Sequence, residues 1–178
     1  METIEVEALC LKSIDYKDND KLLTLYASGV GKLLVNAKGC KKPKAKLKFA
    51  ASVLCFGHYY LTKTSGGYTL TGCDLYDSFY DLATDIEKFY AASVVLEILD
   101  KMGMEEDYNN NLFLMALKCL KELAYETKNP KSCLYGYLKL ILEALGYECN
   151  AITFMEYYNY LLHNHNVQIN SLKELAKI

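Results

Sequence analysis

The residues of this chain whose charge and spacing best indicate a binding function are lysines that lie in one stretch. From Ser28 to Cys73 the sequence holds no Asp or Glu over 46 residues, although the chain as a whole carries 22 acids and a net charge of -2. The same stretch holds eight lysines: Lys32, Lys38, Lys41, Lys42, Lys44, Lys46, Lys48 and Lys63. Crowded charges of one sign repel one another unless a partner neutralises them, so this pattern predicts a surface for a polyanion.

The chemistry expected of this surface is contact with nucleic-acid phosphates. Lysine binds a phosphate as a point charge, and the chain contains no arginine to read a guanine edge. We therefore expect backbone binding with little sequence preference. The predicted DNA-binding residues are Lys32, Lys38, Lys41, Lys42, Lys44, Lys46 and Lys48. Neutralising about six phosphates of a single strand gives a slope near -4 for log K against log salt. The competing interpretation is a solvated, lysine-rich loop.

Five tyrosines lie in or beside the same region and offer stacking surfaces for bases. They are Tyr16, Tyr26, Tyr59, Tyr60 and Tyr68. Base stacking on an aromatic ring contributes roughly 1–3 kcal/mol per base. Spacing typical of strands also predicts that most of these rings are core residues or cross-strand pairs.

The elements that must position these residues are β-strands. Period-two patterns and glycine-rich turns predict strands at residues 4–10, 21–26, 32–37, 51–62 and 68–71. The turn at residues 28–31 predicts a hairpin between the second and third strands. Five short strands in succession favour a small Greek-key barrel of the OB-fold type over residues 1–75.

The remaining residues, 76–178, show the helical period and predict an α-helical domain, which makes the chain an α+β protein. Thr84–Glu87 and Ser171–Glu174 are expected to be capping boxes at helix starts. Asn129 and Asn150 are expected to cap two further helices, and Gly146 is expected to end the helix that begins at Pro130.

Other clusters in the sequence favour a structural interpretation over a functional site. His163 and His165 with Cys149 resemble a metal cluster, but a His-x-His pair near a helix end is more often surface. Four acids fit helix caps and first turns better than a carboxylate site: Asp74, Asp77, Asp81 and Asp85. Glu105–Asp107 is expected to be an interhelical loop. No nucleophile elbow, phosphate loop or dinucleotide fingerprint is present, so we expect no enzyme activity, no metal and no cofactor.

Composition restricts the class of protein further. Half of the residues, 52%, are hydrophobic, and the 7 cysteines are scattered without a Cys-x-x-Cys pair. Without a signal peptide these cysteines are expected to be reduced thiols, several of them buried, in a cytoplasmic protein. No uncharged stretch reaches the length of a membrane span.

The order of these motifs resembles a known family. The motifs are Leu9 and Lys12 with Tyr16, Asp20–Tyr26, Gly31-Lys32-Leu33, Ala37-Lys38-Gly39 with its basic continuation, Leu75–Phe79, Tyr90-Ala91-Ala92, and a helix end at Leu145-Gly146-Tyr147. Over residues 4–147 this order is similar to RecO, a family of bacterial recombination mediators. Within it, Lys38 matches the lysine of an Ala-Lys-Gly motif, and Cys40 and Lys41 occupy the two positions after it.

The resemblance implies an OB-fold joined to a helical domain, in a cytoplasmic, nucleoid-associated DNA-repair protein. It implies binding of single- and double-stranded DNA, annealing of complementary strands, and help in loading the recombinase in the RecF pathway. The implied partners are RecR, the C-terminal tail of single-stranded DNA-binding protein and, indirectly, RecA.

The chain also departs from that pattern. A serine common in the family's basic stretch is Ala45 here, and the four-cysteine zinc motif found after the Leu-Gly-Tyr helix in many members is represented by Cys149 alone. Two alternatives therefore stand beside the mediator: a protein-interaction scaffold of the same fold with weak or no DNA binding, and an enzyme that uses the aspartates between Asp74 and Asp85.

Overall fold

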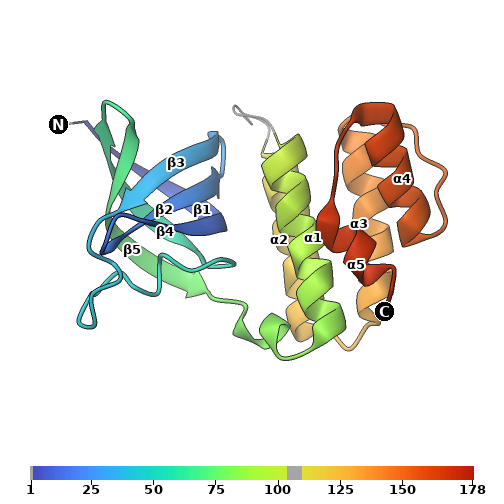
Figure 1. The fold of residues 1–178 in the computed structure, drawn as a ribbon, viewed down its shortest axis with the longest axis horizontal. Coiled ribbons are helices and arrows are strands. Elements are labelled where there is room, and N and C mark those ends of the chain that lie inside the picture. Colours follow the sequence, from blue (N-terminus) through green and yellow to red (C-terminus); the bar gives the residue numbers. More distant parts are fainter. Residues whose placement is uncertain (1, 104–109) are drawn as a thin grey trace. The chain divides into compact units, whose positions relative to one another are not determined.

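The computed structural model describes residues 2–103 and 110–178. These residues divide into two compact units. The first runs to Ser78 and includes Gly103 and Asn110, and the second comprises Phe79–Met102 and Asn111–Ile178. Figure 1 shows the strands in the first unit and the helices in the second. The α+β class expected from the sequence is confirmed, whereas the domain boundary after residue 75 stays a prediction.

The first unit is a closed β-barrel. Its strands are β1 (Thr3–Tyr16), β2 (Asp20–Ala27), β3 (Gly31–Ala37), β4 (Phe56–Thr64) and β5 (Gly67–Asp77). Around the barrel the order is β1-β2-β3-β5-β4, and β1 closes onto β4. Only the β3–β5 pairing, through Val35 and Tyr68, is parallel. The predicted hairpin of the second and third strands and the five-stranded OB-type barrel are confirmed.

Strand β1 is long enough to pair with both of its neighbours because a β-bulge bends it. Its first half pairs with β4, and its second half pairs with β2. The bulge lies between Cys10 and Lys12, where one extra residue enters the ladder. Before the bulge the even-numbered residues, such as Ala8 and Cys10, point into the barrel core. After the bulge the alternation is reversed: Lys12 pairs with Thr24, and the even-numbered residues no longer point into the core.

Three strand boundaries differ from the sequence prediction by more than two residues. The fourth strand begins at Phe56 and not at residue 51, because the preceding segment forms turns in which Ser52 and Cys55 donate to carbonyls three residues earlier. Ala51 and Cys55 are nevertheless buried, which explains why the segment looks like part of a strand. β1 extends six residues beyond Cys10, and β5 extends six beyond Thr71.

The second unit consists of one 3-10 turn, η1 (Tyr80–Ala83), and five helices. The helices are α1 (Ile86–Met102), α2 (Asn111–Tyr125), α3 (Pro130–Ala144), α4 (Phe154–His165) and α5 (Asn170–Leu175). α1 packs against α2, α3 and α5, and α4 packs against α5. Tyr135 of α3 and Phe154 of α4 stack with ring centroids 4.1 Å apart.

Two of the predicted helix boundaries are confirmed. The side chain of Asn129 accepts a hydrogen bond from the Ser132 N–H at 3.2 Å, with Pro130 in the first turn of α3. α3 ends at Ala144, and Gly146 follows with φ of 80°, a left-handed conformation that glycine adopts without strain.

Three predicted caps are wrong. Asp85, not Thr84, caps α1, because its carboxylate accepts from the Lys88 N–H at 2.9 Å. Thr153 caps α4 in place of Asn150, through a 3.2 Å bond from the Glu156 N–H. No side chain of residues 171–174 caps α5, whose free N–H groups are instead satisfied by a carboxylate from α1.

No helix within the described ranges is long and apolar enough to cross a membrane. The predicted interhelical loop at Glu105–Asp107 lies outside the described residues.

Candidate nucleic-acid interface

The lysine loop, residues 38–48, is a chain of tight turns that follows β3. The N–H groups of Lys42, Ala45 and Lys48 each donate to the carbonyl three residues earlier, at 3.2, 3.0 and 3.4 Å. Figure 1 shows the loop, in cyan, extending away from the end of the barrel. Bonds every third residue hold the backbone compact without a helix, while the side chains between them stay free to reach solvent.

Apolar residues at both ends of the loop fix it to the barrel. Cys40, inside the first turn, and Ala50, just after the last lysine, are 3% and 0% exposed and belong to the barrel core. The buried hydroxyl of Tyr59 is a shared donor to two carbonyl oxygens, that of Ala50 at 3.2 Å and that of Cys55 at 3.3 Å. The loop is therefore anchored by packing while its charged side chains remain outside.

The structure places six of the seven predicted DNA-binding lysines on this loop. The side chains of Lys38, Lys42, Lys44, Lys46 and Lys48 are exposed, and their ammonium groups have no partner within the part of the chain that the structure describes. Lys41 is the exception, because its ammonium group lies 2.8 Å from a carboxylate oxygen of Asp15.

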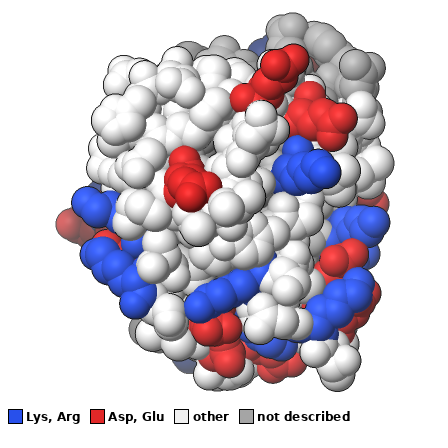
Figure 2. Space-filling model, turned by 90° about the vertical axis from the view of Figure 1, so that its right-hand side faces the viewer, with Lys and Arg blue, Asp and Glu red and all other residues white. Residues whose placement is uncertain are grey.

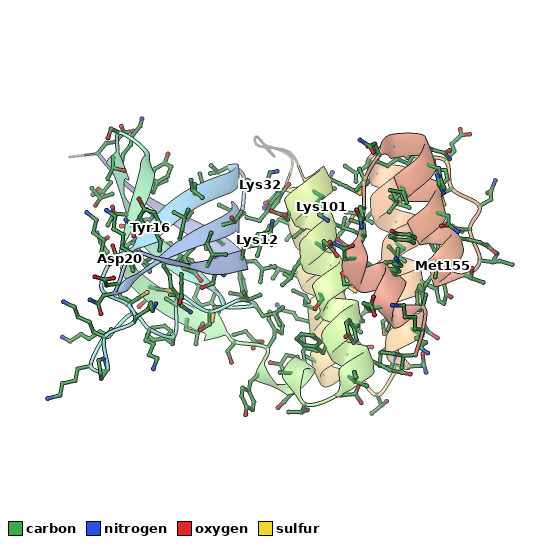
Figure 3. All side chains as sticks on the ribbon, in the orientation of Figure 1. Lys12, Tyr16, Asp20, Lys32, Lys101 and Met155 are labelled. Carbon is green, nitrogen blue, oxygen red and sulfur yellow. The ribbon has the colours of Figure 1, made fainter. Side chains whose placement is uncertain are left out.

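The seventh lysine, Lys32, lies apart from the others. It stands near the start of β3, opposite Tyr26 of β2, whereas Lys38 follows the far end of the same strand. At about 3.3 Å per residue, the backbones of Lys32 and Lys38 are roughly 20 Å apart along the strand. Figure 3 shows Lys32 near Lys12 at one end of the sheet, with Tyr16 and Asp20 at the other end. The role of all seven lysines in DNA binding stays a prediction.

Between these ends, strands β1, β2 and β3 present an apolar outer face. Cross-strand pairing places Ile14 beside Leu22 and Thr24 beside Leu34. Ile14 is 56% exposed, Leu34 is 48% exposed and Tyr16 is 41% exposed. Apolar and aromatic side chains of this kind, bordered by lysines, suit unstacked bases better than a closed duplex.

Sequence reasoning missed most of this outer face. The predicted first strand ends at residue 10, so the sequence assigns no face to Ile14. Had the alternation from Ile4 to Cys10 continued without the bulge, Ile14 and Tyr16 would point inward. Lys17 was also missed, and its ammonium group lies 5.2 Å from the Tyr16 ring centroid, within the range of a cation–π contact. The bulge leaves no clear signal in the sequence, so only the register reveals the face.

The five tyrosines separate clearly in the structure. Tyr26 and Tyr59 are fully buried, and Tyr60 and Tyr68 are half-buried. The Tyr60 hydroxyl donates to Asp74 at 2.8 Å. Only Tyr16 among the five is an exposed ring, so it is the one that remains available for stacking.

The other clusters weighed from the sequence do not assemble into sites. Among residues 2–103 and 110–178, no group of three His, Cys, Asp or Glu side chains is arranged to hold a metal. The four aspartates between 74 and 85 are spread over β5, η1 and the start of α1, so the expectation that all four begin helices is wrong for Asp74 and Asp77. All seven cysteines are free thiols, and burial raises the pKa of Cys10 to about 12.

Charge on the helical unit is distributed differently. Figure 2 looks onto the side that carries α4, where Lys and acidic side chains are interspersed around a broad uncharged area. Several helical lysines are paired, among them Lys101 with Glu97 at 2.7 Å and Lys131 with Glu87 at 3.3 Å. The crowding of unpaired lysines on the loop contrasts with this mixed surface.

Comparison with known proteins places both units in one family. Residues 1–79 match the family described as Recombination protein O N terminal, and residues 83–151 match Recombination protein O C terminal. Similar proteins include the DNA repair protein RecO of Clostridium perfringens, 35% identical over 147 residues, which are 83% of this chain and 60% of that protein. The DNA repair protein RecO of Acetivibrio thermocellus is 25% identical over 83% of this chain and 59% of its own length. The chain thus spans about three fifths of the length of these relatives.

Proposed function

Since the chain belongs to the RecO family, we propose that it is a DNA-repair and recombination mediator that binds DNA backbones through its lysine loop. The observation that carries this proposal is the set of five unpaired lysines on one anchored loop, in a stretch without acids. Lysines without intramolecular partners contribute most to the free energy of phosphate binding, because binding releases the counterions of the nucleic acid and breaks no existing ion pair.

The proposed mode of action is non-catalytic. Phosphates of a single strand lie along the lysine loop while bases contact Tyr16, Ile14 and Leu34 on the outer face. Neutralising the backbones of two complementary strands lowers their mutual repulsion, which is the physical basis for the annealing activity that we assign to the chain. Duplex DNA is expected to bind through its backbone alone. Help in loading the recombinase in the RecF pathway belongs to the same proposal.

A groove between α2 and α3 supports the proposed contact with single-stranded DNA-binding protein. It has a volume of about 470 Å³ and apolar walls that include Met115, Tyr137 and Leu140. Lys118, Glu122 and Lys128 also line it. Lys128 pairs with Glu126 at 2.7 Å and lies 3.9 Å from Glu122, whereas the Lys118 ammonium has no partner among the described residues. An apolar groove with the unpaired Lys118 ammonium at its edge suits a C-terminal tail that is both acidic and hydrophobic. RecR as a direct partner and RecA as an indirect one remain proposals from the family.

The test of DNA binding is a salt titration of filter binding with single-stranded DNA. Replacing Lys42, Lys44, Lys46 and Lys48 by Ala should weaken binding and make the slope of log K against log salt shallower by about 3. The matched control replaces Lys88, Lys139, Lys173 and Lys177 on the helical unit, which removes the same charge. Equal losses in both variants would show that net charge, and not the loop, drives binding.

The alternative function is a scaffold of the same fold with weak or no DNA binding. The observations that favour it are the net charge of -2 and the groove itself. Gly136 of α3 lines the groove, and a Cβ there would have no atom within 4 Å. The large side chain of G136F should therefore block a tail peptide, whereas the methyl group of G136A should not. The probe is a fluorescent peptide with several Asp residues, an apolar end and a free carboxylate. Peptide binding without retention of DNA at low salt would select the scaffold.

A further inference from the structure

The turn between β1 and β2 is joined to the lysine loop by two hydrogen bonds. The Gly39 N–H donates to a carboxylate oxygen of Asp20 at 2.7 Å, and the Lys41 N–H donates to the Asn19 carbonyl at 3.0 Å. Gly39 has φ of 66°, a left-handed conformation that is strained for other residues. Asp20 therefore stabilises the tight turn with which the loop begins.

A second aspartate contacts the loop in a different manner. Asp15, near the end of β1, pairs with the Lys41 ammonium at 2.8 Å and is itself 66% exposed. The hydrogen bond from Lys41 lowers the pKa of Asp15, which favours the ionised carboxylate. This carboxylate holds no backbone group of the loop, and its main effect is to neutralise one of the loop's lysines.

The contact between Asp20 and Gly39 borders a concave site. It has a volume of about 510 Å³ and lies between the β1–β2 turn and the start of the loop. Its lining residues are Lys17, Asp18, Asn19, Asp20, Lys38, Gly39 and Lys42. Two of its lysines, Lys38 and Lys42, have no ionic partner within the described chain. The site is wide enough for a phosphate group, and its shape depends on the turn that Asp20 holds.

We propose that Asp20 and Asp15 control phosphate binding by the lysine loop in opposite directions, Asp20 at this site and Asp15 at the neighbouring Lys41. Asp20 is a positioning residue that fixes the turn at Gly39 and thereby presents Lys38 and Lys42 to a phosphate. Asp15 is a resident anion that competes with the phosphate for Lys41. The inference rests on the proposed DNA binding and assigns one strand phosphate to the site.

The two roles follow from what each carboxylate touches. A loop that is already ordered loses less conformational entropy when a ligand binds, so the Asp20 contact favours binding despite its negative charge. The Asp15–Lys41 pair is exposed to solvent and therefore weak, so a phosphate is able to displace it, but at a cost in affinity. Simple electrostatics instead predicts that removing either acid strengthens DNA binding.

The experiment measures single-stranded DNA binding as a function of salt for five variants and the unchanged protein. D20A should weaken binding about threefold to tenfold, whereas D20N, whose amide oxygen still accepts the Gly39 N–H, should stay within about twofold. D15N should bind about twofold to fivefold more tightly, with a slope steeper by about 0.7 as Lys41 becomes available. Hydrogen exchange at the Gly39 amide should quicken in D20A and not in D20N.

Glycine variants test the turn without changing any charge. A Cβ at Gly39 meets nothing closer than 3.9 Å, so G39A strains the turn without a clash and should weaken binding as D20A does. Gly29, with φ of 67° and open space around it, carries the same strain in the β2–β3 turn, and G29A should leave binding unchanged. This pair also decides the matter if D20A fails to fold.

The outcomes separate the inference from the function on which it rests. Absence of DNA binding by the unchanged protein overturns the proposed function. Binding by the unchanged protein, combined with tighter binding by D20A or with unchanged binding by G39A, overturns the role of Asp20 alone. Unchanged or weaker binding by D15N overturns the role of Asp15.

Discussion

The carboxylate of Glu97 in α1 accepts hydrogen bonds from the backbone N–H and the hydroxyl of Ser171 in α5, at 2.9 and 2.5 Å. The same carboxylate accepts the Asn170 N–H at 3.0 Å and pairs with Lys101 at 2.7 Å. It therefore serves as the N-terminal cap of a helix 74 residues away in the sequence. α5, which lies beyond the family match, is thus tied to a helix inside it.

Removing this cap should destabilise the helical unit. We expect E97A to lower the free energy of unfolding by about 1–3 kcal/mol, because the two N–H groups of α5 lose their acceptor. Urea unfolding followed by circular dichroism measures the change. Glu87 of the same helix is the matched control: it contacts Lys131 at the surface, so E87A should cost about 0–1 kcal/mol. Equal losses in the two variants would contradict the capping role.

The same carboxylate should make stability depend on pH in acid. Burial raises the pKa of Glu97, but hydrogen bonds from Lys101, Ser171 and Asn170 outweigh it and hold the pKa below its ordinary value of 4.5. A group whose pKa is lowered by folding stabilises the protein fully above that ordinary value, and this contribution is lost as the pH falls through the lowered pKa. The difference in unfolding free energy between the unchanged protein and E97Q should therefore shrink from pH 6 to pH 3. A constant difference over that range counts against an ionised cap.

Local signals in the sequence predicted the elements that depend on local physics. The β2–β3 hairpin follows from its glycine turn, and the start of α3 follows from Asn129 and Pro130, since both need only neighbouring residues. Thr153 and Glu156 form a capping pair of the same local kind, and the Ile152 N–H donates to Glu156 at 2.8 Å. This pair is visible in the sequence and predicts the start of α4 better than Asn150 does.

Long-range contacts explain what the sequence did not reveal. The cap of α5 comes from Glu97, and no spacing rule connects residues so far apart. The outward direction of Ile14 and Tyr16 depends on the bulge beside Cys10, and the pairing of Lys41 with Asp15 depends on where the lysine loop turns back. The sequence therefore predicted which lysines share one segment, but not which of them are already neutralised.

Gly57 of β4 lies so close to β5 that the position should accept no other residue. A Cβ at Gly57 of β4 would lie 2.5 Å from the Asp74 carbonyl oxygen and 3.1 Å from the Leu75 Cα of β5. Backbone atoms cannot move aside as a side chain does, so we expect G57A to destabilise the barrel by about 1–3 kcal/mol. Gly66, in the β4–β5 turn, has open space around it, and G66A should change stability by less than about 0.5 kcal/mol. Thermal unfolding of both variants checks the contrast, and a stable G57A protein would refute this close approach of β4 and β5.

Gly136 offers the opposite case, a glycine that the fold does not require. It lies within α3, and a Cβ there would contact nothing within 4 Å. Glycine inside a helix costs conformational entropy, so G136A should raise the free energy of unfolding by about 0.5–1 kcal/mol. Urea unfolding measures it. A loss of stability would mean that the α2–α3 groove is narrower than the structure indicates.

The exposed ring of Tyr16 should contribute to binding of single strands and not of duplexes. Its exposure of 41% and its place beside Ile14 and Asp20 leave the ring open to an unstacked base, whereas bases inside a duplex remain stacked on each other. Losing one base–aromatic contact costs about 1–3 kcal/mol, so Y16A should weaken single-stranded DNA binding by roughly five- to 150-fold. Y16F keeps the ring and should bind as the unchanged protein does.

Because Tyr16 carries no charge, the slope of log K against log salt should stay the same in Y16A and Y16F. Equal weakening for single- and double-stranded DNA would indicate a general disturbance of the β1–β2 turn, and the outer face would then have no role in contacting bases.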